Sequence, residues 1–116
     1  MVHVASPFPL DMKDEARIIK PAVEGTKSVL KACAHSKIKR VVITSSCVSI
    51  MWTKDKNKTV FTPKDWSDLD VCNAYDKSKT LAEKAAWEFA DSKEAKGLEI
   101  VTINPGLIVG PNLVTS

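Results

Sequence analysis

Residues 40–46 read Arg-Val-Val-Ile-Thr-Ser-Ser, and this stretch decides the fold class. Its central part is a run of β-branched apolar residues, which is typical of a strand buried inside a parallel sheet. Residues 2–7 look like another short buried strand that runs into a turn, because prolines follow it. Residues 98–104 have the same apolar character and end at Pro105-Gly106. The sequence therefore predicts three short strands.

Two helical segments separate the expected strands. The segment from about Asp14 to Ala34 carries a helical stripe of apolar residues, with Thr26 filling its gap. The stripe consists of Ile19, Val23, Leu30 and Cys33. Gly25 inside this pattern indicates that another backbone packs closely. Residues 74 to about 90 are helical again, and Gly97 ends that segment. Helices that alternate with apolar strands predict βαβ units, hence an α/β fold with a parallel sheet.

Length and charge limit the classes of protein. The chain has 116 residues, 44% hydrophobic, with a formal net charge of +3. This is one small domain or a piece of a larger one, and it is too apolar for a disordered segment. A small, dispersed positive charge does not favour nucleic-acid binding. The longest charge-free stretch, 100–116, contains prolines, glycines and asparagines, so no membrane span is expected. No signal peptide is visible, and a cytoplasmic location is expected.

The cysteines and histidines do not indicate a metal site. Cys33, Cys47 and Cys72 form no CxxC pair, and their number is odd. The two histidines, His3 and His35, are far apart in the sequence. We therefore expect free thiols in a reducing compartment and no bound metal.

Tyr75 is the only tyrosine, and Lys79 follows it by four residues on the second expected helix. This spacing places both side chains on one helix face. A cation beside a phenol stabilises the phenolate and lowers the phenol pKa, so that the group can exchange a proton with a substrate oxygen. The same pair also fits an ordinary exposed Tyr–Lys contact on a helix.

The ends of two strands carry further candidate groups. Ser45 and Ser46 follow the central strand, where a hydroxyl could donate to a substrate carbonyl oxygen. A serine that caps nearby backbone amides is the alternative. The loop 105–111, Pro-Gly-Leu-Ile-Val-Gly-Pro, could bring backbone amides close to a flat polar ligand, or it could simply end the strand. No GxSxG motif supports a serine hydrolase.

These elements together resemble the extended short-chain dehydrogenases/reductases, most closely the branch of the dihydroflavonol and cinnamoyl-CoA reductases. The resemblance covers essentially the whole chain, and residues 75–90, YDKSKTLAEKAAWEFA, are highly specific. The other matching stretches are 3–7, 20–26, 40–46 and 103–111. It implies a partial Rossmann-like doubly wound sheet of about three strands and two main helices.

The resemblance also implies residue roles. Tyr75 matches the catalytic acid/base, Lys79 the lysine that lowers its pKa and holds the nicotinamide ribose, and Ser46 the serine that orients the substrate carbonyl. Ser45 is the alternative if the register shifts by one residue. The expected cofactor contacts are Ala5, Ser6, Tyr75, Lys79, Pro105, Gly106, Leu107 and Ile108. The implied reaction transfers a hydride between NADP or NAD, with NADP favoured, and an aldehyde or ketone.

One departure from the family limits this expectation. The four glycines, at 25, 97, 106 and 110, form no GxxGxxG or GxGxxG motif, which family members use to hold the cofactor pyrophosphate. Residues 1–116 are therefore expected to be the central to C-terminal half of an NAD(P)-binding Rossmann domain, without the Gly-rich first βαβ unit or the substrate domain. The alternative function is a catalytically inactive product that acts through partners, including self-association through an exposed sheet edge.

Overall fold

The computed structural model describes residues 1–8 and 14–111. Its strands are β1, Val2–His3; β2, Arg40–Thr44; and β3, Glu99–Ile103. Its two α-helices are α1, Glu15–His35, and α2, Ala74–Ala90. Short 3₁₀ helices occupy Cys47–Ser49 (η1), Leu69–Val71 (η2) and Lys93–Ala95 (η3). This order confirms the predicted alternation of strands and helices.

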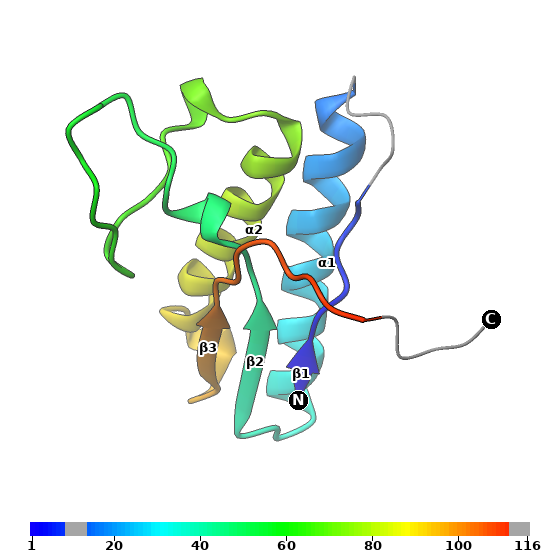
Figure 1. The fold of residues 1–116 in the computed structure, drawn as a ribbon. Helices are drawn as coiled ribbons and strands as arrows, with labels where there is room; N and C mark the ends of the chain where they lie inside the picture. Colours follow the sequence, from blue (N-terminus) through cyan, green and yellow to red (C-terminus); the bar gives the residue numbers. More distant parts are fainter. Residues whose placement is uncertain (9–13, 112–116) are drawn as a thin grey trace.

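The strands form one parallel sheet in the order β1-β2-β3 (Figure 1). In this sheet Val42 of β2 lies in register with Val2 of β1 and with Val101 of β3. Parallel pairing brings the carboxyl ends of the strands to one edge. Beyond that edge the pairing continues, because the Cys47 amide donates to the Pro105 carbonyl at 3.0 Å. The α/β fold class with a partial Rossmann-like sheet is confirmed.

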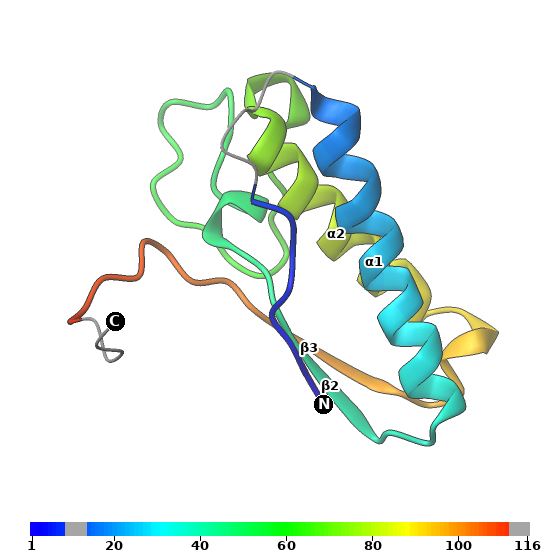
Figure 2. The same ribbon diagram turned by 90° about the vertical axis from the view of Figure 1, so that its right-hand side faces the viewer.

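Both α-helices cover the same face of the sheet (Figure 2). The core lies between them and that face, where Val41 and Ile43 of β2 point. It consists of Leu30, Cys33, Ala34, Val41, Ile43, Ala86, Phe89, Ala95, Leu98 and Ile100. Burying a large apolar side chain of this kind stabilises the fold by about 1.5–3 kcal/mol. In the described part of the chain, no helix has the length and apolar character needed to cross a lipid bilayer.

The buried stripe of α1 includes Thr26, Leu30 and Cys33, as predicted, but is displaced by one residue in the first part of the helix. Ile18 and Ala22 are buried, whereas Ile19 and Val23 are only half-buried. The reason is that α1 packs on α2 as well as on the sheet, and small side chains such as Ala22 permit that approach. Gly25 is exposed, and a side chain there would meet nothing within 4 Å. The expected close backbone contact at Gly25 is therefore wrong.

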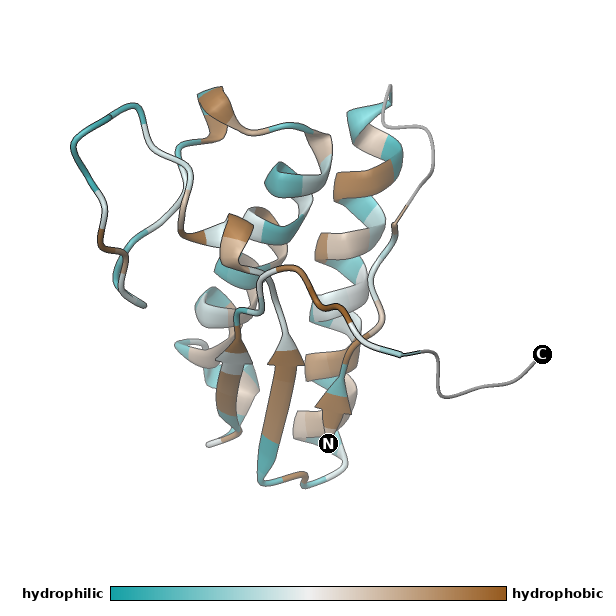
Figure 3. Cartoon of the chain, in the orientation of Figure 1, coloured by the Kyte–Doolittle hydropathy of each residue, from teal (hydrophilic) through white to brown (hydrophobic). Residues whose placement is uncertain are grey.

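The first strand is less buried than the sequence suggests. Val2 is 64% exposed and Val4 is 61% exposed, while His3 between them is half-buried. The β1 strand lies at an edge of the sheet, and alternate side chains point to the face that neither α1 nor α2 covers. Figure 3 shows hydrophobic residues on all three strands. An apolar sequence thus produced a strand that is buried on one face only.

The start of α2 is fixed by a capping box. The Asn73 side chain accepts from the Asp76 amide at 3.0 Å, and the Asp76 carboxylate accepts from the Asn73 amide at 3.4 Å. This pair satisfies backbone donors that a helix N-terminus otherwise leaves free. It also sets Tyr75 in the first turn of α2, near the carboxyl edge of the sheet. Gly97, at φ 79°, lies in the turn before β3 and not at the end of α2, which is Ala90.

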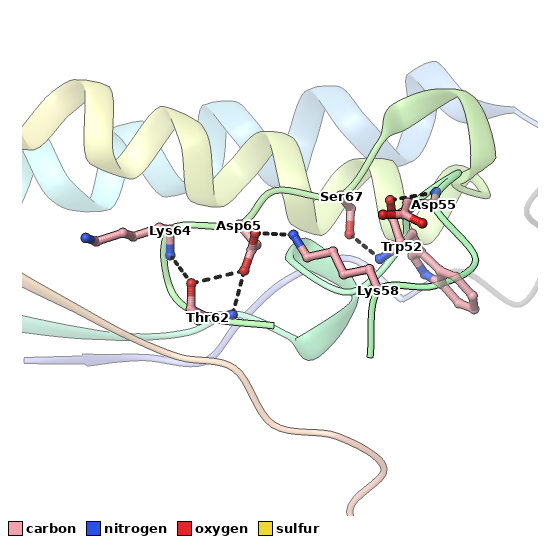
Figure 4. Close-up of polar contacts among 8 residues, drawn as sticks. Trp52, Asp55, Lys58, Thr62, Lys64, Asp65 and Ser67 are labelled. Carbon is pink, nitrogen blue, oxygen red and sulfur yellow. Dashed lines mark hydrogen bonds and ion pairs between the residues drawn. The ribbon is translucent and has the colours of Figure 1, made fainter. Parts of the chain in front are cut away.

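The long loop between η1 and η2 is irregular and is held by its own polar contacts (Figure 4). Asp65 pairs with the Lys58 ammonium and accepts from the Thr62 amide at 2.7 Å. The hydrogen bond from Lys58 is the main reason that the pKa of Asp65 is lowered to about 2. Ser67 accepts from the Trp52 amide at 2.9 Å, which ties the two ends of the loop together.

Candidate active site

The candidate site lies at the carboxyl edge of the sheet, where functional sites of open α/β sheets form. A narrow crevice opens there between the end of β1, the end of β2 and helix α2. Ala5, Ser6, Thr44 and Lys79 are among the residues that line it. The fold thus brings together two predicted cofactor contacts from the N-terminal segment and the predicted lysine, which is far away in sequence.

Tyr75 and Lys79 lie on one face of α2, as their spacing predicts. The Lys79 Nζ atom is 6.0 Å from the centre of the Tyr75 ring. The ring of Phe8, from the segment after β1, packs edge-on against Tyr75 with the ring centres 5.3 Å apart. Tyr75 is half-buried and Lys79 is 9% exposed. Both polar groups therefore lie in a partly desolvated environment.

The two serines after β2 have different surroundings. Ser46 caps η1, where its Oγ atom accepts from the Val48 amide at 3.4 Å. Its hydroxyl is also near enough to the Tyr75 side chain to lower the phenol pKa. Ser45 instead donates to Glu83 and lies 3.0 Å from the Ser49 hydroxyl. Of the two candidates, Ser46 is the serine that the structure brings to Tyr75.

The pKa of Tyr75 is shifted in the direction opposite to the prediction. Burial raises it above its usual value, and the hydrogen bond from Ser46 opposes this rise only in part. Lys79 does not lower it in this arrangement, because its ammonium is 6.0 Å from the centre of the ring. Burial also lowers the pKa of Lys79 itself. The expected phenol of low pKa is therefore wrong for these side chains by themselves.

Lys79 has the properties of a group that binds a ligand. No hydrogen bond or ion pair joins its ammonium to another residue within 1–8 or 14–111. A partly desolvated ammonium that faces a crevice can take an acceptor from another molecule. The hydroxyl groups of a ribose are acceptors of this kind, and Lys79 shares its crevice with Ala5 and Ser6. The residues present thus fit the ribose of a nicotinamide cofactor.

The loop after β3 is not brought to Lys79 in the way that Ala5 and Ser6 are. The Pro105 carbonyl is held by the Cys47 amide, one residue from Ser46. Gly106 is exposed, Leu107 is 93% exposed and Ile108 is 79% exposed. Figures 1 and 2 together show this segment leaving the sheet edge on the side away from the helices. Among the predicted cofactor contacts, these three residues are not brought to Lys79.

Two residues at the site were not singled out from the sequence. Glu83 and Asn104 form a buried polar cluster behind Ser46, in which Asn104 Nδ2 donates to Glu83 Oε2 at 2.8 Å and to the Ser46 carbonyl at 3.0 Å. The available signal was spacing, since Glu83 follows Lys79 by four residues and continues the same helix face. Within the described residues, no three His, Cys, Asp or Glu side chains gather as metal ligands would.

Comparison with known proteins identifies relatives along the whole chain. The model of the 3-beta hydroxysteroid dehydrogenase/isomerase family matches residues 1–114. Dihydroflavonol 4-reductase of Arabidopsis thaliana is 43% identical over 98% of this chain and 31% of its own length. Cinnamoyl-CoA reductase CAD2 of Medicago truncatula is 43% identical over 96% of this chain and 36% of its own length.

A solved structure supports the same relationship. Gre2 from Candida albicans, in complex with NADPH, superposes with a TM-score of 0.84 and 37% sequence identity. The match covers 97% of this chain and 37% of Gre2. This chain thus spans about one third of the length of the relatives it matches. It belongs to the 3-beta hydroxysteroid dehydrogenase/isomerase family of extended short-chain dehydrogenases/reductases, in the branch of the dihydroflavonol and cinnamoyl-CoA reductases.

Proposed function

We propose that this chain carries the catalytic centre of an NAD(P)H-dependent reductase that acts on a small aldehyde or ketone. The observation that supports it is the meeting of Ser46, Tyr75 and Lys79 at one sheet edge, from two elements far apart in sequence. The partly desolvated ammonium of Lys79, which has no hydrogen-bond or ion-pair partner within residues 1–8 and 14–111, adds a binding group for the cofactor ribose.

Each residue has a distinct task in this proposal. A bound nicotinamide cofactor supplies the hydride. The Ser46 hydroxyl donates a hydrogen bond to the substrate carbonyl oxygen and stabilises the negative charge that develops there. The Tyr75 hydroxyl gives its proton to the same oxygen. Lys79 holds the ribose hydroxyl groups with its ammonium group.

The raised pKa of Tyr75 sets the form in which the residue begins the proposed reduction. A phenol whose pKa lies above its usual value is protonated throughout the neutral range. In that form Tyr75 can donate a proton to the carbonyl oxygen.

The cofactor preference and the location are part of the same proposal. NADPH is proposed ahead of NADH because Gre2, 37% identical to this chain, was solved with NADPH. Cys47, Tyr75 and Lys79 do not distinguish a phosphate from a hydroxyl group at the ribose 2′ position, so NADH is the alternative to test. A cytoplasmic location is proposed from the sequence.

Association with other protein is a second candidate function, and a specific observation favours it. Val2, Val4 and Ile103 are each more than 50% exposed, and β1 and β3 form the two edges of the sheet. Apolar surface and free strand edges are features of interaction sites. The partner in this proposal is a second copy or a longer relative, and the chain alone would be catalytically inactive.

A chimera tests the catalytic proposal. Residues 1–114 would replace the matching third of the Arabidopsis dihydroflavonol 4-reductase, and NADPH consumption would be measured with a dihydroflavonol. We expect activity that Tyr75→Phe lowers at least about 100-fold, the contribution typical of a general acid. Lys79→Met should raise the KM for NADPH and lower kcat.

Lys77→Met is the matched control for Lys79→Met. Lys77 lies on the same helix but pairs with Glu15 at 2.8 Å, away from the crevice. We expect the control to retain activity within a few-fold. A folded chimera that keeps full activity without the Tyr75 hydroxyl would refute the catalytic role. Titration of the purified chain with NADPH and NADH would show separately whether it binds either cofactor alone.

A further inference from the structure

A buried carboxylate lies behind the candidate site. Glu83 is 6% exposed and belongs to α2, one helical turn after Lys79 and two turns after Tyr75. Its two oxygens accept hydrogen bonds from four side chains. The donors are Ser45 Oγ, Asn104 Nδ2 at 2.8 Å, Thr102 Oγ1 at 3.2 Å and Trp87 Nε1 at 3.3 Å.

These contacts surround Ser46 without touching its hydroxyl. Asn104, held by Glu83, also donates to the Ser46 carbonyl at 3.0 Å. Ser45, the preceding residue, donates to Glu83 and lies 3.0 Å from the Ser49 hydroxyl at the end of η1. The backbone before and after Ser46 is therefore fixed to one carboxylate, which is itself fixed to the helix that carries Tyr75.

Packing does not require a carboxylate at this position. The neighbouring helix residues that face inward are small and apolar: Ala82, Ala85 and Ala86. A buried carboxylate costs free energy that only complete hydrogen bonding offsets. Every buried polar side-chain atom in the described residues has a partner, so Glu83 meets that condition. Its arrangement is that of a polar network that specifies geometry.

We propose that Glu83 is a positioning residue that holds Ser46 against Tyr75 by joining the carboxyl ends of β2 and β3 to helix α2. This inference deepens the proposed function and rests on the roles of Ser46 and Tyr75. Its test needs neither cofactor nor substrate, because it concerns the contact between the two hydroxyl groups. Failure of the reductase proposal and failure of this one are therefore distinguishable.

The sole tyrosine provides the measurement. Since the chain has one tyrosine, phenolate absorbance during a pH titration of the complete chain reports Tyr75 alone. Burial raises the pKa of Tyr75, the nearby Ser46 hydroxyl lowers it, Asp76 and Cys47 raise it, and Lys79 lies over the ring. Glu83→Gln replaces one acceptor oxygen by an NH₂ group, so that either Asn104 Nδ2 or Trp87 Nε1 loses its acceptor, and loss of the Asn104 contact should displace Ser46. We expect the Tyr75 pKa to rise by roughly 0.5–1 unit, equivalent to losing one hydrogen bond.

Two comparisons separate positioning from a general structural role. Thr102→Val removes a donor to the same carboxylate but leaves Ser45 and Asn104 in place, so the Tyr75 titration should not change. In a Ser46→Ala background, Glu83→Gln should add no further shift, because the hydroxyl through which it acts is gone. A purely structural role would lower stability in both backgrounds and leave the folded-state titration of Tyr75 unchanged.

A second variant decides the question if Glu83→Gln does not fold. Asn104→Ala removes the link between Glu83 and the Ser46 carbonyl while the other donors to Glu83 remain. Circular dichroism would establish that each protein is folded over the titrated range. A higher Tyr75 pKa in either folded variant supports the proposal. A wild-type titration in every folded protein of the pair Glu83→Gln and Asn104→Ala, or an equal shift in Thr102→Val, would overturn it.

Discussion

The two faces of the sheet carry the same types of residue, but one face is buried and the other is partly exposed. Val41 and Val42 are adjacent in β2, yet Val41 is fully buried beneath the helices while Val42 is half-buried on the other face. The same contrast holds at the edges of that second face, where Val2 is 64% exposed and Ile103 is 52% exposed. In the described residues, α1 and α2 both lie on one side (Figure 2).

This difference separates the face of the sheet that the helices of the chain cover from the face that they leave exposed. The covered face holds the core and the Glu83 network, so Ser46, Tyr75 and Lys79 are positioned by contacts within the chain. The open face carries apolar side chains that neither α1 nor α2 covers. Exposed apolar patches of this kind mark interaction surfaces. The positioning of the site should therefore depend on the first face, and association should depend on the second.

The largest expected effect is the difference between two valine-to-alanine changes. Val41→Ala should lower the free energy of unfolding by about 2–3 kcal/mol, because it leaves a cavity in the core. Val42→Ala removes the same atoms from the open face and should cost less than about 1 kcal/mol. Urea denaturation followed by circular dichroism measures both values.

The two valines control for each other, since they share strand, residue type and β-propensity. Equal losses for both variants would show that the open face is covered in solution. A concentration-dependent loss for Val42→Ala alone would indicate that self-association provides the cover. The first result would contradict the contrast between the faces, and the second would identify the open face as the association surface.

Association provides the next largest effect. Ile103→Lys places a charge on the open face at the β3 edge, and charges on edge strands oppose pairing with another chain. We expect it to weaken self-association by at least about tenfold, as burying an uncompensated charge in an interface costs more than 1.4 kcal/mol. Sedimentation velocity over a range of concentrations measures this change.

Val60→Lys is the matched control. Val60 is 74% exposed but lies in the loop between η1 and η2, away from the sheet. Its substitution should leave association unchanged. If Val60→Lys disrupted association and Ile103→Lys did not, the loop and not the sheet would be the contact surface.

The fold followed from the sequence wherever a local pattern determined the structure. The β-branched run at 40–44 formed β2, and the segment predicted as helix over 74–90 became α2 at those bounds. Tyr75 and Lys79 shared a helix face because a spacing of four residues requires it.

The remaining features depended on contacts between distant segments. The burial of Ile18 in place of Ile19, in the first part of α1, depends on packing against α2 and the sheet, which periodicity does not encode. The raised pKa of Tyr75 came from burial, and spacing to Lys79 alone predicted the opposite direction. The Glu83 network includes a hydrogen bond between residues 58 positions apart, so no single motif could reveal it.

The smallest expected effect comes from the one β1 side chain that turns towards the helices. His3 is half-buried beside Lys79, and burial first and the charge of Lys79 second lower its pKa below 6.5. A histidine with a lowered folded-state pKa binds fewer protons in the folded than in the unfolded chain. Its contribution to stability is therefore complete above pH 6.5 and is lost as the pH falls through the lowered value.

We expect wild-type stability to decline slightly between about pH 7 and pH 5, within the range where histidine titrates. His3→Gln should remove that decline, since glutamine does not titrate. His35→Gln changes the other histidine, which is exposed at the end of α1, and should leave the decline in place. Urea midpoints at several pH values compare the three proteins. A decline that persists in His3→Gln and disappears in His35→Gln would mean that His3 is exposed to solvent, like its neighbours Val2 and Val4. The covered face of the sheet would then not extend to β1.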